Sequence, residues 1–332
     1  MNNATHTDSM DRGKPNEVAT PKKNVPRTTT LSAFQSFLEN TTSGKTAPVP
    51  TGCTVLDEHL RGGLRNELYI LMAEPGAGKT TLCLSMLPRF AAEKRDVLFI
   101  SLDMSKDQIL GKIASRLSYD LPNEKTPLEY YDVLDLTDTD YAGDLIAAYT
   151  READYTTIYD RSDIKSMNDI TIAIEEIGFV AEYPPIVIID YLQILAAMHE
   201  TATERDAVEK ALNFCREIIS KYNTPMILIS SISRNAYGKK LSLSSCKESG
   251  SIEYAADYVI GLERNIDAEQ SCDGDLRPIT MKFFKSRFAI SMAENNLYMV
   301  PKYNLYLMAS SAADEADHAC NTEAVDDEYK LV

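Results

Sequence analysis

Metal-binding and disulfide-forming patterns are scarce in this sequence. It has six cysteines and four histidines, and no two cysteines show the CxxC spacing of zinc sites and redox motifs. Disulfide frameworks are typical of secreted chains much shorter than 332 residues. We therefore expect reduced thiols and no structural zinc.

Long apolar runs and excess positive charge are also missing. No run approaches the roughly 18 residues of a membrane span, and the first twenty residues lack the apolar stretch of a signal peptide. These absences predict a soluble, cytoplasmic protein with no membrane partner. Lys and Arg number 34 against 50 Asp and Glu, a net charge of −16. This charge excludes a polycation that coats nucleic acid by bulk attraction, but not a local basic loop.

The two ends of the chain differ from its middle. Residues 1–30 are rich in Asn, Thr, Pro and charge, which predicts a disordered segment, and residues 31–50 read as a short helix over 31–38 followed by a linker. Residues 311–332 hold seven acidic residues and one Lys, which predicts an acidic disordered tail. The alternative for this tail is an interaction segment that mimics nucleic acid. The remaining residues, 51–310, are expected to form one folded domain.

Short apolar runs alternate with helical patterns through this domain. The runs are LYILM at 68–72, VLFISL at 97–102, IVII at 186–189 and MILI at 226–229. Continuous apolar strands separated by helices indicate a parallel sheet that is covered on both faces. After residue 253 the pattern changes to consecutive strands. We predict an α/β fold with a mostly parallel sheet, helices on both faces and antiparallel edge strands at the C-terminal end.

The strongest motif is AEPGAGKT at residues 73–80. It fits the phosphate-binding loop GxxxxGK[ST] except at Ala73, and it lies between an apolar strand and a helix, a context that argues against a chance glycine-rich turn. Small residues let backbone N–H groups wrap phosphates, Lys79 would neutralise the β- and γ-phosphates, and the Thr80 hydroxyl would ligate Mg²⁺. The predicted ligands are ATP and Mg²⁺. The residues expected at the nucleotide are Glu74, Pro75, Gly76, Ala77, Gly78, Lys79, Thr80 and Thr81.

Two acidic residues follow apolar strands. Asp190 ends IVIID and fits the acid that positions Mg²⁺ in such ATPases. Asp103 follows VLFISL, where a carboxylate could polarise the attacking water. The alternative for Asp103 is entry into a helix that Ser105 caps, with Gln108 at capping-box spacing.

The segment from Thr51 to about Met308 resembles the C-terminal ATPase domain of DnaB-type replicative DNA helicases. The matching stretches follow the family's order, and DYLQIL together with KESGSIEYAAD is more specific than the nucleotide loop. They favour this family over recombinases and clock-type ATPases. The stretches are TGCTVLDEHLRGGL, AEPGAGKTT, VLFISLDMSKDQILGKIASRL, VIIDYLQIL, TPMILISSISR, KESGSIEYAADYVIGLER and FKSR.

This resemblance implies a RecA-like P-loop NTPase fold and several roles. Asp103 matches the family's catalytic Glu, in a stretch that usually reads SLEMS. Lys285 and Arg287 match the basic pair that a neighbouring subunit projects onto the γ-phosphate, although alone they read as exposed charges at a strand end. Ser231 stands where the family usually has a Gln that contacts the γ-phosphate. The shorter side chains of Asp103 and Ser231 should leave nucleotide binding intact but affect hydrolysis and its coupling to movement.

The family also places a loop after ISSISR in the channel of its ring. Here that loop carries Arg234, Tyr237, Lys239 and Lys240, with Gly238 for flexibility. Basic side chains and an aromatic ring suit single-stranded DNA, and a solvated turn is the alternative. Because residues 31–310 are acidic overall, one chain should bind DNA weakly, and a ring would concentrate several copies of the loop.

The predicted function is an ATP-dependent, helicase-like motor of DNA replication that translocates on single-stranded DNA. The resemblance implies a homo-oligomer, a hexameric ring in the family, with other replication proteins as partners. Small versions of the family resemble proteins of phages, plasmids and integrated elements. The alternative is a DnaB-like, ATP-binding regulator or loader that does not separate strands.

Overall fold

The computed structural model describes residues 29–122, 125–198, 203–247, 249–269, 276–288 and 294–307. Its contacts divide the chain into two compact units, Met1–Ala47 and Pro48–Val332. The predictions for the first 28 residues and for the acidic tail lie outside the described residues.

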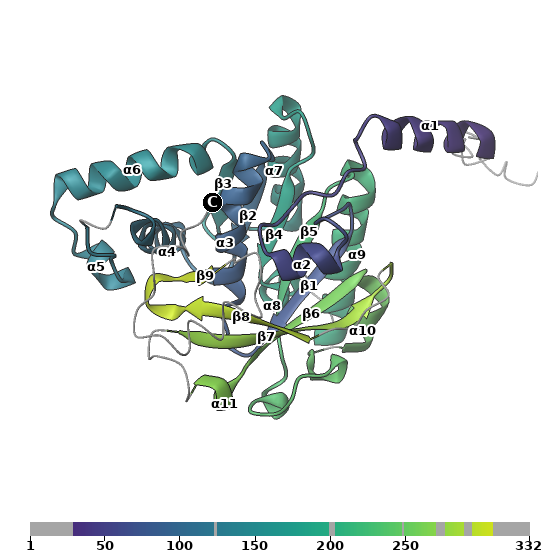
Figure 1. Cartoon of the computed structure of the whole chain (residues 1–332). Coiled ribbons are helices and arrows are strands. Elements are labelled where there is room, and N and C mark those ends of the chain that lie inside the picture. Colours follow the sequence, from purple (N-terminus) through teal and green to yellow (C-terminus); the bar gives the residue numbers. More distant parts are fainter. Residues whose placement is uncertain are drawn as a thin grey trace, which may run out of the picture. The chain divides into compact units, whose positions relative to one another are not determined.

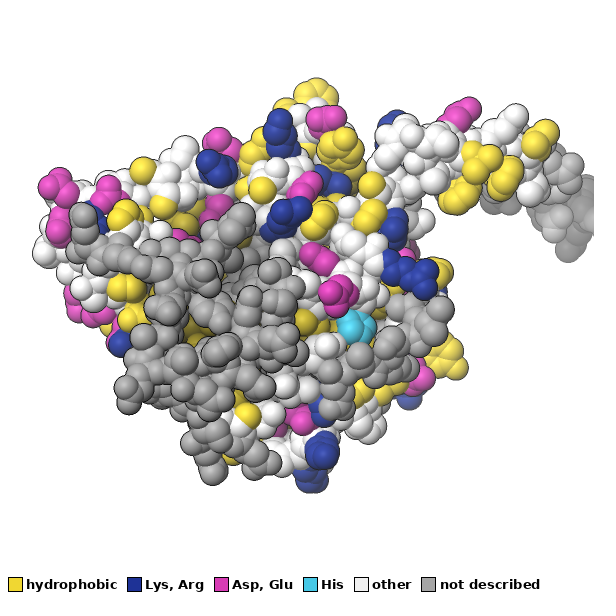
Figure 2. All heavy atoms as spheres, viewed as in Figure 1, with side chains coloured by type: hydrophobic (Ala, Val, Ile, Leu, Met, Phe, Trp, Pro, Cys, Tyr) yellow, Lys and Arg dark blue, Asp and Glu magenta, His cyan; other side chains and the backbone are white. Residues whose placement is uncertain are grey.

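The described part of the first unit is helix α1, Thr30–Thr42. The hydroxyl of Thr29 caps it by accepting a hydrogen bond from the backbone N–H of Ser32. The helix predicted over 31–38 is present and is longer than expected. Its large apolar side chains are all exposed, and hydrophobic side chains are visible along this helix in Figure 2. These side chains are Leu31, Phe34, Phe37 and Leu38.

Within the described residues, the second unit holds a nine-stranded sheet in the order β3-β2-β4-β5-β1-β6-β7-β8-β9 (Figure 1). Strands β3 to β6 in this order are parallel, and β7, β8 and β9 continue the sheet in antiparallel fashion. The predicted fold class is thus confirmed. The strands are β1 (Leu68–Ala73), β2 (Val97–Ser101), β3 (Thr156–Asp160), β4 (Ile186–Asp190), β5 (Met226–Ser231), β6 (Tyr258–Arg264), β7 (Arg277–Ser286), β8 (Glu294–Val300) and β9 (Leu305–Leu307).

Helices cover both faces of this sheet. On one face, four helices contribute side chains to a first core between them and the sheet. They are α2 (Thr54–His59), α3 (Lys79–Ala92), α4 (Lys106–Tyr119) and α6 (Thr139–Ala153). The other core includes residues of α7 (Met167–Val180), α8 (Leu192–Ala196), α9 (Glu204–Tyr222) and α10 (Ser249–Ala255). The remaining helices are α5 (Tyr130–Leu134), α11 (Ile266–Glu269), η1 (Arg234–Ala236), η2 (Leu243–Ser245) and η3 (Pro301–Tyr303).

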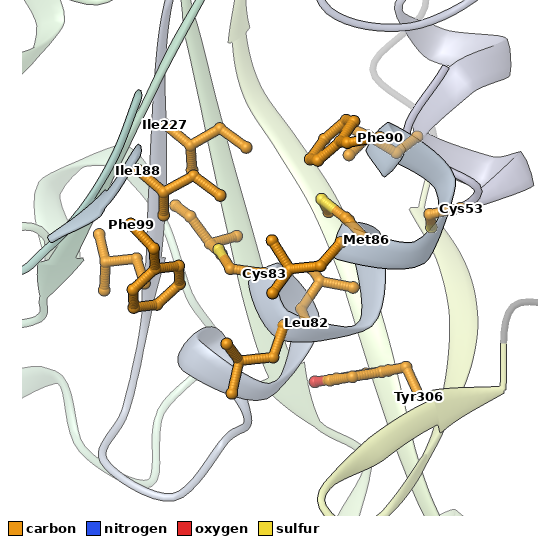
Figure 3. Close-up of a cluster of buried hydrophobic side chains, with 14 of the residues drawn as sticks. Cys53, Leu82, Cys83, Met86, Phe90, Phe99, Ile188, Ile227 and Tyr306 are labelled. Atoms are coloured by element: carbon orange, nitrogen blue, oxygen red, sulfur yellow. The ribbon is translucent and has the colours of Figure 1, made fainter. Parts of the chain in front are cut away.

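Strand β1 divides its side chains between these two cores. Tyr69, Leu71 and Ala73 face the first core, while Leu68, Ile70 and Met72 face the second. Alternate side chains of a strand point to opposite faces, so a strand buried on both sides must be apolar throughout. Figure 3 shows the first core, where Leu82, Cys83 and Met86 of α3 lie among side chains of several other elements.

Strand β3 was not predicted from the sequence. Its residues read TTIYD, and Ile158 is the buried residue among them. It forms the edge of the sheet beside β2, where a single buried side chain is enough to hold the strand against the core. The strand therefore lacks the continuous apolar run that marks its neighbours.

Within the described residues, no helix combines the length and apolar character needed to cross a bilayer.

Candidate functional site

The phosphate-binding motif forms the turn between β1 and α3, at the carboxyl edge of the parallel strands. Gly76 and Gly78 have φ of +76° and +84°, which favours glycine at both positions. A Cβ atom on Gly78 would also lie 2.6 Å from both the Met299 sulfur and the Tyr306 hydroxyl oxygen. Pro75 and Gly76 are exposed, whereas Ala77 and Thr81 are buried. The loop is therefore open to solvent at Pro75 and Gly76 and tightly packed beneath Ala77 and Gly78.

Two residues from the antiparallel end of the sheet support this loop. The buried Tyr306 hydroxyl donates to the Ala77 carbonyl oxygen at 2.9 Å, and Arg277 Nη1 donates to the Gly76 carbonyl oxygen at 3.2 Å. Burial raises the pKa of the Tyr306 hydroxyl, so it stays a neutral donor. The sequence analysis missed both residues, because a Tyr in a short strand and an Arg at a strand start carry no motif.

Lys79 is folded onto the loop that precedes it. Its Nζ donates to the carbonyl oxygens of Ala73 at 3.0 Å and Glu74 at 2.9 Å. Burial lowers the pKa of Lys79, while the negative charges of Asp190 and Asp103 oppose this change. The ammonium group is thus held at the loop by carbonyl dipoles and nearby carboxylates.

Thr80 and Asp190 meet at the start of α3. The Thr80 hydroxyl donates to Asp190 Oδ2 at 2.5 Å, and Asp190, at the end of β4, is only 5% exposed. Burial raises the pKa of Asp190, and the Thr80 hydrogen bond and the Lys79 charge act in the opposite direction. A hydroxyl beside a carboxylate is a donor set that suits Mg²⁺, which prefers oxygen ligands. Within the described residues, no three His, Cys, Asp or Glu side chains form a metal site, so phosphate oxygens and waters would have to complete such a shell.

Asp103 lies on the same edge of the sheet as Asp190. Strand β2 ends at Ser101, which pairs with Asp190, and Asp103 follows two residues later. Its negative charge opposes the lowering of the Lys79 pKa and adds to the raising of the Asp190 pKa. The predicted capping box between Ser105 and Gln108 is also present.

The first turn of α4 has a second cap besides this box. Its Lys106 backbone N–H donates to the Asp160 carboxylate at 2.8 Å. Ser105 and Asp160 thus cap the start of α4, and Asp103 makes no contribution to these caps. Its side chain is exposed.

Ser231 ends β5 next to the nucleotide loop, where it pairs with Ala73. Its backbone N–H donates to Gln193 Oε1 at 3.2 Å, and Gln193 Nε2 donates to the Ser230 hydroxyl at 3.1 Å. The sequence analysis gave Gln193 no role. Its place in the DYLQIL stretch was the signal available.

The basic loop follows β5 and is closed at its base. Ile232 forms a bridge with Cys246, and the Ser233 N–H donates to the Ser245 carbonyl oxygen at 2.8 Å. The four predicted DNA-binding side chains all lie exposed on the loop between these contacts. They are Arg234, Tyr237, Lys239 and Lys240.

Sequence similarity identifies the family of this chain. Residues 48–296 match the family model described as DnaB-like helicase C terminal domain. The chain belongs to this family. The replicative DNA helicase DnaB of Helicobacter pylori (strain J99) is 28% identical over 240 residues, which cover 70% of this chain and 48% of that protein. A probable replicative DNA helicase of Trieres chinensis is 26% identical over 232 residues, 66% of this chain and 48% of that protein.

The chain spans about half the length of these curated relatives of the DnaB-like family (48%). Among solved structures, a DnaB-like replicative helicase, described with its interactions with primase, superposes with a TM-score of 0.67 at 20% identity, covering 85% of this chain and 67% of that one. Similarity at this level of identity concerns the fold alone, and it agrees with the RecA-like class predicted from the DnaB-like motifs.

The basic pair of the DnaB-like FKSR stretch lies away from the nucleotide loop. Lys285 is in β7, and Arg287 follows this strand and pairs with Asp257 at 2.7 Å. Asp257 in turn contacts the N–H of Leu68, at the amino end of β1. The nucleotide loop begins at the other end of β1, about 16 Å away for six residues of strand. Lys285 and Arg287 are therefore not brought together with Lys79, Thr80 and Asp190 of the same chain.

Proposed function

We propose that this protein is an ATP-dependent motor that hydrolyses ATP and translocates on single-stranded DNA as part of DNA replication. The observation that supports it best is the Thr80–Asp190 hydrogen bond beside Lys79, within a family of DnaB-like helicase domains. The proposed ATPase domain is 51–310. The proposed location is the cytoplasm.

The phosphates would bind the backbone N–H groups of the loop and the start of α3, with Lys79 leaving its carbonyl partners for the β- and γ-phosphates. Glu74, Pro75, Gly76, Ala77 and Gly78 form the loop around them, and Thr81 continues the first turn of α3. Thr80 and Asp190 would hold Mg²⁺, which supplies positive charge to the phosphate oxygens during transfer. Ser231, which ends β5 beside Ala73, would face the γ-phosphate with a shorter side chain than the family's Gln.

Asp103 would accept the proton of the attacking water or orient that water. It follows the strand end that pairs with Asp190, and its negative charge contributes to the pKa of both Lys79 and Asp190. As an Asp, it reaches less far than the family's Glu, and we expect slow turnover.

The remaining charge for the transition state would come from another copy of the chain. Lys285 and Arg287 lie at the amino edge of the sheet, so their own loop is out of reach. A homo-oligomer, proposed as a hexameric ring, would place them at the loop of a neighbour, as in arginine-finger mechanisms. The exposed apolar side chains of α1 offer a surface for such assembly.

The basic loop would bind single-stranded DNA. Lys239 and Lys240 supply charge for the phosphate backbone, and Tyr237 supplies a ring for base stacking. Arg234, at the start of η1, adds a further exposed charge.

The test is the rate of ATP hydrolysis with and without single-stranded DNA, together with oligomer size and displacement of a labelled strand from a fork. The motor predicts hydrolysis that DNA stimulates, and strand displacement that requires ATP. ATP binding without displacement in assembled protein would support the second candidate, a regulator or loader of other replication proteins. The short side chains of Asp103 and Ser231 favour that candidate.

A further inference from the structure

We propose that Asp257 is a positioning residue that holds Arg287 for the nucleotide of a neighbouring chain, and that Arg216 is a second arginine of the same surface. The proposal rests on the proposed trans role of Arg287. It adds two residues to which the sequence analysis gave no role.

Asp257 is a buried carboxylate that contacts two arginines and one backbone N–H group. It is 3% exposed and immediately precedes β6. Its Oδ1 pairs with Arg287 Nη1 at 2.7 Å, and its Oδ2 accepts from Arg216 Nη1 at 2.6 Å and from the Leu68 N–H at 2.9 Å. Charge-assisted bonds of this length fix the direction of both guanidinium groups.

The backbone fixes the carboxylate itself. The Asp257 N–H donates to the Leu68 carbonyl oxygen at 2.9 Å, and the Arg287 N–H donates to the Asp257 carbonyl oxygen at 3.0 Å. Asp257 is therefore locked to β1 and to the end of β7 at the same time. A side chain held on central strands places its partners more precisely than one on a free loop.

Three cations gather around this carboxylate, and the charges of Glu67 and Glu253 also act on members of the group. Arg216 and Arg287 each keep more than a third of their side chain exposed (37% and 41%). Lys285 lies beside them, donates to the carbonyl oxygens of Glu253 and Ala256, and has its pKa lowered by burial and by the charge of Arg287. The exposed parts of Arg216 and Arg287 can therefore bind an anion from outside the chain.

A neighbouring carboxyl has another partner. Glu67 accepts a hydrogen bond from the Tyr69 hydroxyl at 2.8 Å, and burial raises its pKa. The charges of Arg65 and Arg287 oppose this rise, and both arginines of the Asp257 cluster keep part of their side chains exposed. Two planar guanidinium groups held by one anchor match the several oxygens of a phosphate group.

A purely structural role is the competing explanation. In that case the arginines only neutralise a carboxylate that joins β1, β6 and β7, and their loss would affect stability but not hydrolysis in a neighbour. The two roles differ in one measurable way: a positioning defect belongs to the chain that donates the arginine, so an intact neighbour corrects it.

The experiment uses the full chain carrying Asp257→Asn, which keeps the shape and an acceptor but loses the charge. We expect ATP affinity within about twofold of the wild type and turnover lower by on the order of 10²-fold, because displacement of a catalytic group by about 1 Å costs this much. Mixing with Lys79→Ala chains should restore part of the turnover, since those chains supply intact arginines. Arg216→Ala should show the same pattern, and Arg216→Lys a smaller loss.

The matched control is Lys210→Ala, which removes an exposed cation from the same helix α9 and should leave turnover unchanged. Wild-type turnover in Asp257→Asn or in Arg216→Ala would overturn the proposal. So would a loss that Lys79→Ala chains do not restore in confirmed mixed oligomers. If Asp257→Asn does not fold, Arg216→Ala and its mixtures decide alone.

The trans role has its own test in Arg287→Ala. Full turnover in that variant removes the trans assignment itself. In a second outcome, Arg287→Ala loses turnover, mixing restores it, and Asp257→Asn and Arg216→Ala have normal turnover. That outcome leaves the trans assignment intact and overturns only the positioning role.

Discussion

The Glu74 carboxylate accepts a hydrogen bond of 2.6 Å from the backbone N–H of Gly238. Glu74 belongs to the nucleotide loop and Gly238 to the exposed basic loop, 164 residues further along the chain. A second carboxylate, Glu263, accepts from the Leu241 N–H on the same loop. The position of Lys239 and Lys240, between these two anchors, thus depends partly on a residue that would lie beside bound phosphates.

The first prediction concerns this contact between the loops. Glu74→Ala should reduce the effect of an ATP analogue on single-stranded DNA affinity, because coupling between two sites needs a contact that both can change. Glu74→Gln is the matched control, since its amide oxygen keeps an acceptor for Gly238. DNA titrations with and without the analogue measure the ratio of affinities. An unchanged ratio in the Ala variant would count against the role of this contact.

The second prediction is loss of turnover in Lys79→Ala. The Lys79 ammonium group, which the loop carbonyl oxygens hold in place, would neutralise the phosphates of ATP. Without it, we expect ATP binding or hydrolysis to fall below detection. Lys165→Ala removes an exposed Lys before α7 and should behave as the wild type. A Lys79→Ala protein with normal ATPase activity would falsify the assignment of the loop.

The third prediction concerns Asp103. Asp103→Asn should lower turnover while ATP affinity stays nearly unchanged, because the carboxylate would act on the attacking water and not on the nucleotide. Asp103→Glu should raise turnover by restoring the reach of the family's Glu. ATPase rates and thermal midpoints are measured for both. Full turnover with a lowered midpoint in the Asn variant would point instead to a role at the entry of α4.

The fourth prediction concerns stability. Arg116 and Glu152 form a buried ion pair of 2.5 Å between α4 and α6, with side chains 1% and 7% exposed. Arg116→Met should cost about 3–5 kcal/mol, since it leaves Glu152 buried without its partner. The double variant Arg116→Met with Glu152→Leu should be more stable than Arg116→Met alone. Urea denaturation measures the free energies of unfolding, and a double variant that loses as much as the two single variants together would contradict the pairing.

The pH dependence of this effect has a defined sign. Burial raises the pKa of Glu152, and the Arg116 charge and hydrogen bond oppose the rise, so Arg116→Met should raise it further. A carboxyl that binds its proton more tightly when folded loses stability as pH rises above its unfolded pKa of about 4.3. The destabilisation by Arg116→Met should therefore be larger at pH 8 than at pH 5.

Much of the fold could be predicted because its central strands are buried on both faces. Strands β1, β2, β4 and β5 are continuous apolar runs, and the box between Ser105 and Gln108 marks the start of α4. Strand β3 could not be found in this way, because an edge strand needs few buried apolar side chains. The order of the strands in the sheet depends on contacts between distant segments, and no local pattern encodes them.

The candidate site shows the same division. Lys79, Thr80 and Asp190 follow from motifs, because their chemistry requires those residues at fixed places along strand ends. The contacts of Asp257 with Arg216 and of Tyr306 with Ala77 join residues 41 and 229 positions apart. Asp257 and Ala77 lie in motif stretches, but Arg216 and Tyr306 do not, so only the folded chain reveals these contacts.

The hydrogen bond from Tyr306 to Ala77 also sets an order of events during synthesis. The nucleotide loop leaves the ribosome 229 residues before the tyrosine that supports it. At roughly 5–20 residues per second, this delay is about 10–45 s. Until β9 is made, the carbonyl of Ala77 and the space beside Gly78 have neither the hydroxyl nor the ring that fill them in the finished protein. A nascent chain should therefore acquire its phosphate-binding loop in final form only when β9 has docked.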